Sequence, residues 1–490
     1  MQKWKDFFKG KRVTVMGLGL LGRGLGDAIF LAEHGAELIV TDFRDKKALA
    51  PSLAKLKKYK DIKYTLGQHK LEDFSAKGGQ APPDFILKAA GILLDSPYIA
   101  EARKHKIPIE MDASLFAKLA PKGITIVGVT GTRGKSTVTA IIYDILSSPP
   151  PRLRRGAGGG VVGSIYKGGN LVPEATLPLL EKVKSGDIVV LELDSWQLQG
   201  FHDAKISPQV AVFTTFLDDH LAYYKGDRKR YFEDKAAVFK YQKKGDVLIF
   251  GAQAVRMLRK GQSFVTKDCP LRNTTVVARA ADIPADWKIP LLGEHNLENI
   301  ACAIAVAKHF KIPESAIRKA VENFKPVPGR LEFIREVKGI KIYNDNNATT
   351  PDATIAGLRA LSSPPRLRRG VTTESRDGVV GSENIILIMG GTDKGLDMSK
   401  LVAEIPKHCK AVILLKESGT AKFLTLIHNS KFIIQEIVEA ENLKECVEKS
   451  MELAECGDTV LFSPAFASFG KWFKNEYDRG EQFVKMVESL

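Results

Sequence analysis

The stretch Gly128-Val-Thr-Gly-Thr-Arg-Gly-Lys-Ser-Thr137 decides how the rest of this chain is interpreted. It follows an apolar run at residues 124–129, which predicts a buried strand, and it precedes residues 138–146, whose apolar positions have helical spacing. A glycine-containing loop between a strand and a helix is the context that phosphate binding requires, because N–H groups at a helix N-terminus attract phosphate. The stretch therefore predicts a nucleotide-binding α/β domain.

Each residue type in this loop suits ATP. Glycines let the backbone curl around phosphate oxygens, a lysine neutralises the β- and γ-phosphates, and a Ser or Thr hydroxyl suits Mg²⁺. The general pattern has a glycine where Val129 stands, whereas here Gly128 lies one residue early. A plain surface turn before a helix is the alternative. We expect an ATP site formed by Gly131, Thr132, Gly134, Lys135, Ser136 and Thr137.

A second glycine turn, Gly17-Leu-Gly-Leu-Leu-Gly22, follows a strand expected at residues 13–16. It matches G-x-G-x-x-G, and Asp42 lies 20 residues beyond Gly22, after a strand expected at residues 37–41. Taken alone, the turn favours a dinucleotide site with Asp42 on a ribose hydroxyl, and hence a dehydrogenase. The stronger ATP-type loop favours a turn for another nucleotide diphosphate, and a purely structural turn remains an alternative.

Strands alternate with helices along the whole chain, which predicts an α/β protein with mainly parallel sheets. A chain of 490 residues suggests about three domains. The segment Lys325-Pro-Val-Pro-Gly-Arg330 is the best linker candidate, and we expect domains at residues 1–119, 120–326 and 327–490. Further strands are expected at residues 85–87, 107–109, 188–193, 210–214, 247–250, 331–337, 340–343, 385–389, 411–415 and 459–462.

Two inserts, at residues 147–164 and 362–382, share the peptides SSPP, PRLRRG and GVVGS. Each follows a predicted helix, where a short connection is expected. Pro, Gly and Arg dominate both, so neither is expected to pack a core. One interpretation is a pair of basic binding arms. We favour a repeated genetic element inserted at tolerant surface loops, because folding needs hardly explain near-identical peptides in two unrelated domains.

The composition excludes several classes of protein. With 44% hydrophobic and 27% charged residues, the chain reads as an ordinary soluble globular protein. No apolar run reaches the roughly 18 residues of a membrane helix, no signal peptide is visible, and the five scattered cysteines are typical of reduced thiols in the cytoplasm. The net charge of +16 first suggests nucleic acid. Because the inserts and anionic small substrates account for part of it, we expect no nucleic-acid and no membrane partner.

Several further motifs, all in order along the chain, resemble the Mur ligases. The segment Glu192-Leu-Asp-Ser-Trp-Gln-Leu198 is similar to ELSSFQL of the D-glutamate-adding member, and Asp219-His220 precedes Lys235 at that family's spacing. The resemblance spans essentially the whole chain except the two inserts. The remaining matching motifs are the ATP loop, Gly293–Asn296 with Asn299, Pro328–Arg330, Asn344-Asp345, Ala348–Thr350, Gly390-Gly391 with Lys394, and Ser463–Ser468.

The resemblance implies a Rossmann-like N-terminal domain, a central P-loop ATPase domain with a mainly parallel sheet, and a Rossmann-like C-terminal α/β domain. It implies an ATP-dependent amide ligase that activates a carboxylate as an acyl phosphate, which the amine of D-glutamate then attacks. The expected substrates are UDP-N-acetylmuramoyl-L-alanine and D-glutamate, in cytoplasmic peptidoglycan precursor synthesis. A monomer is expected.

The resemblance also implies roles for individual residues. The catalytic group comprises Lys135, Glu192, His220, Lys235 and Arg330. Mg²⁺, expected as two ions, would be held by Ser136, Glu192, His220 and a carbamylated Lys235. ATP would also contact Asn296, Asn299, Arg330 and Asp345. The substrate residues are Leu20, Leu21 and Gly22 at the diphosphate, Asp42 and Arg44 at uracil, Asn170 at the muramoyl group, and Thr349, Lys394 and Ser468 at the carboxylates of D-glutamate.

Three departures from the family pattern stand out. Asn347 occupies a position where the family usually has lysine, Ala89-Ala90 replaces Ser-Pro, and the segment after Ser468 is one residue longer. Without the spacing match, Lys235 would be predicted on a solvated helix face. The alternatives are a Mur-family or folylpolyglutamate-type ligase for another amino acid, an inactive homologue, and a basic nucleic-acid-binding ATPase.

Overall fold

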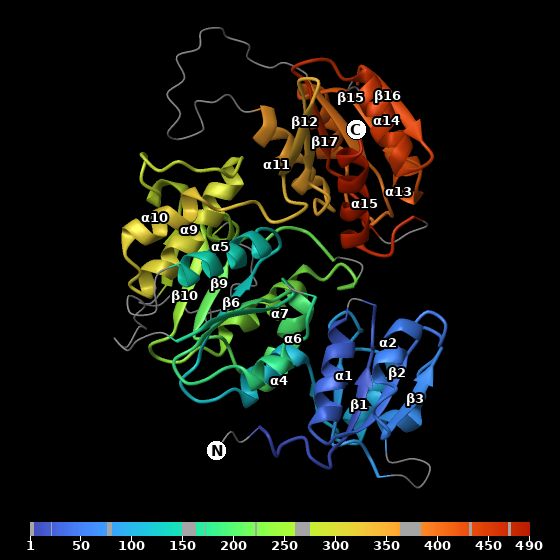
Figure 1. Cartoon of the computed structure of the whole chain (residues 1–490), viewed down its shortest axis with the longest axis vertical. Helices are drawn as coiled ribbons and strands as arrows, with labels where there is room; N and C mark the ends of the chain where they lie inside the picture. The colour runs from blue at the N-terminus through green and yellow to red at the C-terminus, as the bar shows by residue number, and fades with distance from the viewer. Residues whose placement is uncertain are drawn as a thin grey trace. The chain divides into compact units, whose positions relative to one another are not determined.

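The computed structural model describes residues 4–20, 22–75, 81–148, 163–171, 173–220, 223–259, 275–362, 384–430, 434–468 and 472–490. The chain forms two compact units, each with its own core. The first unit comprises Met1–Phe216, Asp227–Ala278 and Ala301–Ile317, and the second comprises Leu217–Gly226, Arg279–Ile300 and Arg318–Leu490. Two sheets belong to the first unit and one to the second (Figure 1).

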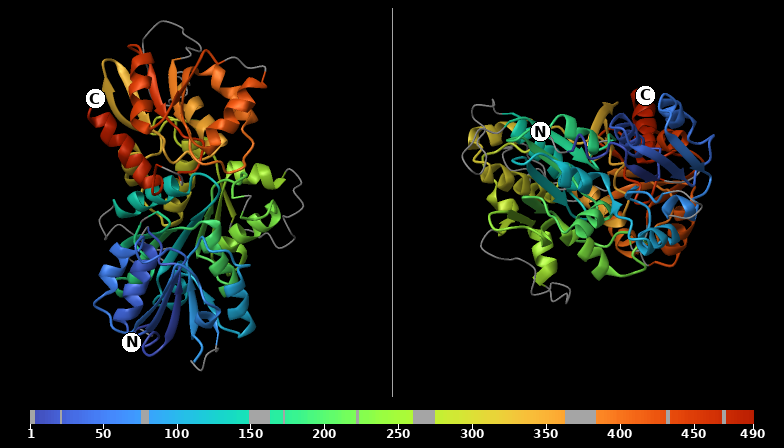
Figure 2. Two further views of the ribbon diagram at one scale, coloured as in Figure 1. Left: turned by 90° about the vertical axis from the view of Figure 1, so that its right-hand side faces the viewer. Right: turned by 90° about the horizontal axis from the view of Figure 1, so that it is seen from below.

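The first sheet is entirely parallel, with strand order β3-β2-β1-β4-β5. Its central strand β1 therefore has β2 on one side and β4 on the other, and the first glycine turn leaves from its carboxyl end. Figure 2 shows this blue sheet from two further sides. The elements are β1 (Arg12–Met16), α1 (Arg23–Glu33), β2 (Glu37–Asp42), α2 (Ala50–Leu56), β3 (Ile62–Leu66), β4 (Phe85–Lys88), α3 (Pro97–Lys104), β5 (Ile109–Glu110) and α4 (Asp112–Leu119).

The second sheet is also parallel throughout, with order β11-β10-β9-β6-β8-β7. Strand β6, which leads into the predicted ATP loop, lies between β9 and β8. The elements are β6 (Thr125–Thr130), α5 (Lys135–Ser147), β7 (Ile165–Gly169), β8 (Ile188–Glu192), α6 (Ser195–Ala204), β9 (Val210–Phe213), α7 (Arg228–Lys240), β10 (Val247–Gly251), α8 (Ala252–Arg259), β11 (Thr275–Ala278), α9 (Glu294–His309) and α10 (Glu314–Glu322).

The third sheet is mixed, with order β12-β13-β17-β14-β15-β16. Strands β12 and β13 form an antiparallel pair, and every other neighbouring pair is parallel. The elements are β12 (Glu332–Val337), β13 (Ile340–Asn344), α11 (Pro351–Ser362), β14 (Ile385–Met389), α12 (Ser399–Glu404), β15 (Cys409–Leu415), α13 (Ser418–His428), β16 (Glu436–Ala440), α14 (Leu443–Leu453), β17 (Thr459–Phe462) and α15 (Glu476–Glu488).

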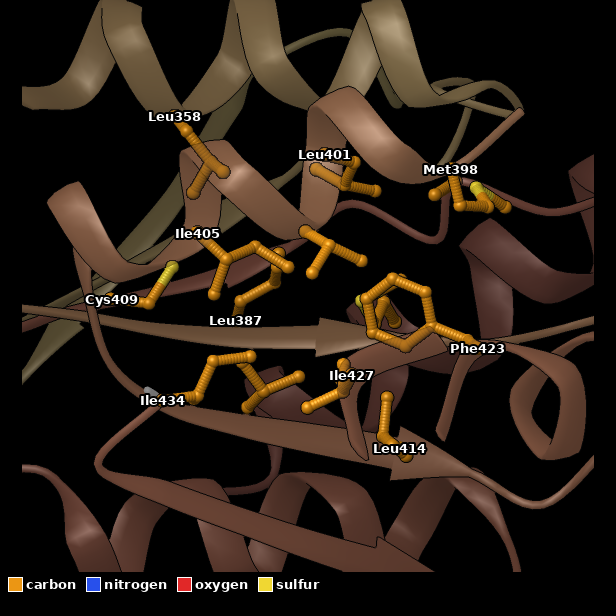
Figure 3. Packing of buried hydrophobic residues seen from close by; sticks show 14 of the residues in the cluster. Leu358, Leu387, Met398, Leu401, Ile405, Cys409, Leu414, Phe423, Ile427 and Ile434 are labelled. Carbon is orange, nitrogen blue, oxygen red and sulfur yellow. The ribbon is translucent and has the colours of Figure 1, made fainter. Parts of the chain in front are cut away.

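Strand periodicity builds a core on both faces of this third sheet. Side chains alternate along β14, so that Leu387 packs in one cluster with residues of α11, α12 and α13, while Ile388 packs in another with α14 and α15. Figure 3 shows the first cluster, where Leu414 lies near Phe423. A strand buried on both faces requires a continuous apolar run, which explains the sequence Ile-Ile-Leu-Ile-Met.

The predicted α/β fold with three sheets is confirmed. The strands that the sequence missed are β3, β7, β11 and β16, and each lies at the edge of its sheet. The strand expected at residues 107–109 instead spans Ile109–Glu110. The predicted helices before the inserts end at Ser147 and Ser362, and the inserts lie almost entirely outside the described residues. Within the described part of the chain, no helix combines the length and apolarity needed to cross a membrane.

The substitution Leu414→Ala is expected to lower the free energy of unfolding of the second unit by about 2–5 kcal/mol, because it leaves a cavity in a fully buried cluster. Leu490→Ala is the control, since this leucine is 45% exposed and its loss should change little. Hydrogen exchange of the β14 and β15 amides under denaturant measures the stability of this unit separately. Equal protection in the two variants would contradict the packing described here.

Candidate active site

The loop between β6 and α5 has the backbone geometry of a phosphate cradle. Gly131 has a φ of 145° and Gly134 a φ of 85°, in the region that favours glycine. A Cβ atom on Gly131 would lie 2.0 Å from Oγ1 of Thr214. Gly134 is the N-cap of α5 and offers no side-chain acceptor, so the first turn of the helix presents its N–H groups to a ligand. This geometry supports the predicted phosphate-binding role of the loop.

The end of β9 braces the same loop. The backbone N–H of Thr132 donates to the carbonyl of Thr215 at 2.8 Å, and the N–H of Arg133 donates to Oγ1 of Thr215, also at 2.8 Å. Sequence analysis missed this support. The available signal was the pair Thr214-Thr215 at the end of a predicted strand, because strand ends that neighbour a phosphate loop are where bracing hydroxyls can act.

Two lysines converge on one carbonyl of the loop. Lys135 Nζ donates to the carbonyl oxygens of Gly131 and Thr132, each at 3.1 Å, and Lys235 Nζ donates to the carbonyl of Gly131 at 2.8 Å. Lys235 is only 1% exposed, so the alternative of a solvated helix face is wrong. The missed signal is helical periodicity, since Lys235 continues the apolar stripe of α7 that contains Tyr231 and Val238. Both ammonium groups thus lie at the loop.

Glu192 lies at the carboxyl end of β8, beside the strand that feeds the loop. It pairs in register with Val129 of β6 and is 2% exposed. Its Oε1 accepts from Asn170 Nδ2 at 3.4 Å, while its Oε2 has no hydrogen-bond partner among the described residues. A buried carboxylate oxygen without a partner is costly. This arrangement therefore favours a ligand or cation as its partner.

The described residues contain no group of three or more His, Cys, Asp or Glu side chains placed to hold a metal ion by themselves. Only some of the predicted metal residues are of these four types. Ser136, Glu192 and Lys235 belong to the first unit, and His220 belongs to the second. His220 has a φ of 55°, a left-handed conformation that is uncommon for a non-glycine residue. The buried Oε2 of Glu192 and the Ser136 hydroxyl are hard oxygen donors that fit Mg²⁺.

The first glycine turn is held by Asp42. Gly17, Gly19 and Gly22 all have positive φ. Asp42 Oδ2 accepts from the N–H of Gly19 at 3.0 Å, and Oδ1 accepts from the N–H of Arg44 at 2.8 Å. The sequence predicted a ligand-binding role for Asp42, and the structure adds a bond that fixes the turn itself. Leu20 is half exposed, and Leu21 lies outside the described residues.

Carboxyl ends of neighbouring strands bring predicted residues together in the second unit. Asp345 directly follows β13, and Ser463 directly follows β17. The Asp345 carboxylate accepts from Ser463 Oγ at 3.0 Å and from the N–H of Leu331 at 3.1 Å. Burial raises the pKa of Asp345 to about 7, although these hydrogen bonds and the charge of Arg330 act in the opposite direction. Asp345 therefore fixes the backbone directly after Arg330, the last residue of the predicted linker.

The three residues predicted for D-glutamate also lie in the second unit. Lys394 Nζ donates to Oγ1 of Thr349 at 3.0 Å. A short antiparallel bridge joins Thr392 to Ala467, and so places buried Ser468 on the segment beside the lysine-bearing loop. Lys394 also lies 3.6 Å from Asp219 Oδ1, so a carboxylate already accompanies this cation. A lysine with two hydroxyl residues is a chemically suitable set for a dicarboxylate.

A fully buried arginine holds these loops in place. Arg479 of α15 donates through Nε to Asn346 Oδ1 at 2.6 Å, through Nη2 to the carbonyl of Asn346 at 2.9 Å, and through Nη1 to the carbonyl of Phe466 at 3.4 Å. Burial lowers its pKa to about 10. Sequence analysis did not single out Arg479, because a lone arginine in a polar helix carries no local signal.

The adenine-side motif has an internal structure. Asn299 Nδ2 donates to Asn296 Oδ1 at 3.0 Å, and Asn296 Nδ2 donates to the carbonyl of Leu292 at 2.8 Å. Both side chains are buried. These hydrogen bonds therefore fix the orientation of both asparagine amides within the motif.

Asn347, which stands where the family usually has lysine, is hydrogen-bonded to the predicted linker at residues 325–330. Its N–H donates to the carbonyl of Gly329 at 2.9 Å, and its Nδ2 donates to the carbonyl of Pro328 at 3.0 Å. An amide thus fixes the segment before Arg330 where a cation was expected.

Comparison with known proteins identifies the class. Residues 129–307 match the Mur ligase middle domain, and residues 329–466 match the Mur ligase glutamate ligase domain. Together with the phosphate loop, these matches define an ATP-dependent ligase. The first match ends at residue 307 and the second begins at residue 329. The boundary expected at 326/327 lies in the interval between them, although the boundaries themselves remain predictions.

Full-length relatives identify the family. The chain is 32% identical to the UDP-N-acetylmuramoylalanine--D-glutamate ligase of Roseiflexus sp. (strain RS-1), over 98% of this chain and 99% of that protein. It is 31% identical to the ligase of the same name from Borreliella afzelii (strain PKo), over 99% of each. The chain therefore belongs to the Mur ligases, the ATP-dependent ligases of peptidoglycan synthesis.

Solved structures agree on the fold. The UDP-N-acetylmuramate-alanine ligase MurC from Thermotoga maritima matches with a TM-score of 0.55 at 19% identity, covering 98% of this chain and 99% of that one. The MurF ligase from Thermotoga maritima in complex with ADP matches with a TM-score of 0.54 at 17% identity, covering 99% and 96%. These likenesses confirm the three-sheet α/β architecture.

The carboxyl of Asp345 is expected to titrate near pH 7. The folded state then binds its proton more tightly than the unfolded chain, whose carboxyl has a pKa of 3.8. Asp345 therefore destabilises the fold progressively as the pH rises from about 4 to about 7. The melting temperature of Asp345→Asn should gain on that of the wild type over this range, and a carbon-13 NMR titration should show the midpoint. An ordinary midpoint near 4 would contradict the burial.

Proposed function

We propose that this chain joins D-glutamate to UDP-N-acetylmuramoyl-L-alanine, forming ADP and phosphate, in cytoplasmic peptidoglycan precursor synthesis. Two observations together carry the proposal. The strand β6 that leads into the phosphate loop lies beside β8, which ends in the buried, half-partnered carboxylate of Glu192, and the chain is similar over its full length to ligases named for this reaction. The remaining predicted residues complete the substrate sites.

The substrate would be held at its nucleotide end by the first glycine turn. Leu20, Leu21 and Gly22 would contact the diphosphate, where glycine leaves the backbone N–H groups accessible. Arg44 and Asp42 would contact uracil. Because Asp42 also holds the N–H of Gly19, nucleoside recognition and the shape of the diphosphate turn depend on one carboxylate.

Activation begins when a carboxylate oxygen of UDP-N-acetylmuramoyl-L-alanine attacks the γ-phosphorus of ATP. The bond from this phosphorus to the β–γ bridging oxygen breaks, ADP leaves, and an acyl phosphate forms. Charge neutralisation and alignment dominate the catalysis of phosphoryl transfer. Lys135, at the phosphate loop, and Arg330, at the end of the predicted linker, would supply this positive charge. Asn296, Asn299 and Asp345 would position the nucleotide.

Amide formation follows when the neutral amine of D-glutamate attacks the acyl carbon. The carbon–oxygen bond to phosphate breaks, phosphate leaves, and the nitrogen loses a proton. Thr349, Lys394 and Ser468 would hold the two carboxylates of D-glutamate. The Lys394–Thr349 hydrogen bond supports this, because it already directs the ammonium and the hydroxyl to one place.

Ser136, Glu192 and His220 would hold Mg²⁺, which supplies charge neutralisation at the phosphate oxygens when bound. Lys235 would hold a second ion after carbamylation. The ammonium group would first lose one proton, and the neutral amine would then add to carbon dioxide and lose a second proton, which turns a buried cation into a carboxylate-bearing group. One N–H remains on that nitrogen, so the bond to the carbonyl of Gly131 can persist.

Release of ADP should require ATP, UDP-N-acetylmuramoyl-L-alanine and D-glutamate together. Among a panel of D- and L-amino acids, including those used by other Mur and folylpolyglutamate-type ligases, D-glutamate should be the preferred acceptor. Coupled detection of ADP measures this. Release without both partners, or preference for another amino acid, would contradict the proposal.

Lys135→Ala should abolish turnover, because the phosphoryl charge loses its cation at the loop. Lys184→Ala removes an exposed lysine of the same unit and should leave turnover near wild type. Steady-state ADP release compares the two. Near-normal turnover in Lys135→Ala would refute the assigned phosphate site.

Carbamylation is tested without turnover. After equilibration with carbon-13 bicarbonate, the wild type should show a carbamate carbon signal by NMR that Lys235→Ala lacks. Lys229→Ala, which changes an exposed lysine on α7, should retain the signal. The same spectrum in all three proteins would argue against a modified Lys235.

A further inference from the structure

Arg23 links the first glycine turn to the second sheet. It is the first residue of α1 and directly follows Gly22. Its Nη1 donates to Asn170 Oδ1 at 2.7 Å, and its Nη2 donates to the carbonyl of Asn170 at 3.1 Å. Asn170 directly follows β7, and all these residues belong to the same compact unit. A guanidinium at the diphosphate turn thus holds both oxygens of one asparagine.

Asn170 in turn holds Glu192. Its backbone N–H donates to the carbonyl of Glu192 at 2.8 Å, and its Nδ2 donates to Glu192 Oε1 at 3.4 Å. The preceding Gly169 has a φ of 70°, and a Cβ there would lie 2.1 Å from the carbonyl oxygen of Glu192. The chain can approach Glu192 this closely only because residue 169 is glycine.

The chemistry of these contacts fixes the orientation of the Asn170 amide. A guanidinium has only donors, so the group facing it must be the amide oxygen, and the amide nitrogen must face the carboxylate. The planar fork of arginine also spans the side-chain and backbone oxygens at once, which a lysine ammonium does with less geometric definition. Arg23 therefore determines which atom Asn170 presents to Glu192.

We propose that Arg23 is a positioning residue that acts through Asn170 to hold the carboxylate of Glu192 in a fixed place relative to the UDP-substrate turn. The proposal rests on the proposed function, in which Glu192 binds the metal of the ATP site. Partners of metal ligands typically change metal affinity or activity about tenfold to hundredfold when they are removed. Arg23 is an outer member of such a chain of contacts.

A simpler role for Arg23 would be to neutralise Asp27, one helical turn later on α1. Burial raises the pKa of Asp27 well above its usual value, with a further contribution from Asp112, while the charge of Arg23 acts in the opposite direction. The geometry of Arg23 nevertheless disfavours neutralisation of Asp27 as its main role. The two short guanidinium contacts described above both go to Asn170.

Steady-state kinetics test the proposal with four variants: Arg23→Met, Arg23→Lys, Asn170→Ala and the double variant Arg23→Met/Asn170→Ala. Arg23→Met should lower kcat about tenfold to hundredfold with a small change in KM for D-glutamate. Arg23→Lys should recover part of the loss. The double variant should be no worse than Asn170→Ala, because Arg23 acts through that side chain. The affinity for Mn²⁺ with ADP, followed by the EPR signal of free Mn²⁺, should fall with Arg23→Met by a similar factor.

Arg103→Met is the matched control. Arg103 of α3 also links the first sheet's helices to those of the second, since its Nη2 lies 3.9 Å from Asp203 Oδ2 of α6. This ion pair involves none of the predicted site residues. It should behave as the wild type in both assays. Circular dichroism confirms folding, and if Arg23→Met fails to fold, Arg23→Lys and Arg23→Gln take its place.

Two results would overturn the inference: activity and Mn²⁺ affinity of Arg23→Met within twofold of the wild type, or losses from Arg23→Met and Asn170→Ala that multiply in the double variant. Glu192→Gln separates this from the proposed function. An inactive Glu192→Gln with a normal Arg23→Met rejects the role of Arg23 alone, whereas an active Glu192→Gln rejects the assigned site.

Discussion

The central parallel strands of the first two sheets determine where the two glycine turns lie. Strand β1 has β2 on one side and β4 on the other, and β6 lies between β9 and β8. Connections that diverge from such a strand leave a crevice beyond its carboxyl end, and ligands bind there in open α/β sheets. Both glycine turns occupy these positions. The third sheet follows the same principle, since Asp345 and Ser463 follow adjacent parallel strands.

Backbone carbonyls and buried charges then shape each crevice. Lys135 and Lys235 share the carbonyl of Gly131, so both side-chain nitrogens are held at the phosphate loop. Glu192 supplies negative charge on the adjacent strand. In an environment that excludes water, such charges interact more strongly than they do in solution, which is why an ATP-dependent enzyme gains from burying them.

The sequence was informative where structure depends on local pattern. Central strands such as β14 are continuous apolar runs, and the glycine turns require particular backbone angles, so both were predicted. The missed strands β3, β7, β11 and β16 all lie at sheet edges, where one side has no neighbouring strand and the apolar pattern is weaker. Strand β7 illustrates this, because its sequence Ile-Tyr-Lys-Gly-Gly has a lysine and two glycines in place of a continuous apolar run. Long-range contacts, such as Arg23 with Asn170 or Lys235 with Gly131, have no local signature, because 147 and 104 residues separate the partners.

The contact between Arg479 and Asn346 has a consequence for the order in which the protein matures. The arginine lies on the last helix, while the loops that it holds, around Asn346 and Phe466, carry the residues assigned to the amino-acid acceptor. During synthesis, the nucleotide turns of the first two sheets can form long before α15 has left the ribosome. The loops around Asn346 and Phe466 cannot obtain their buried guanidinium until then, so they are fixed later than the two glycine turns.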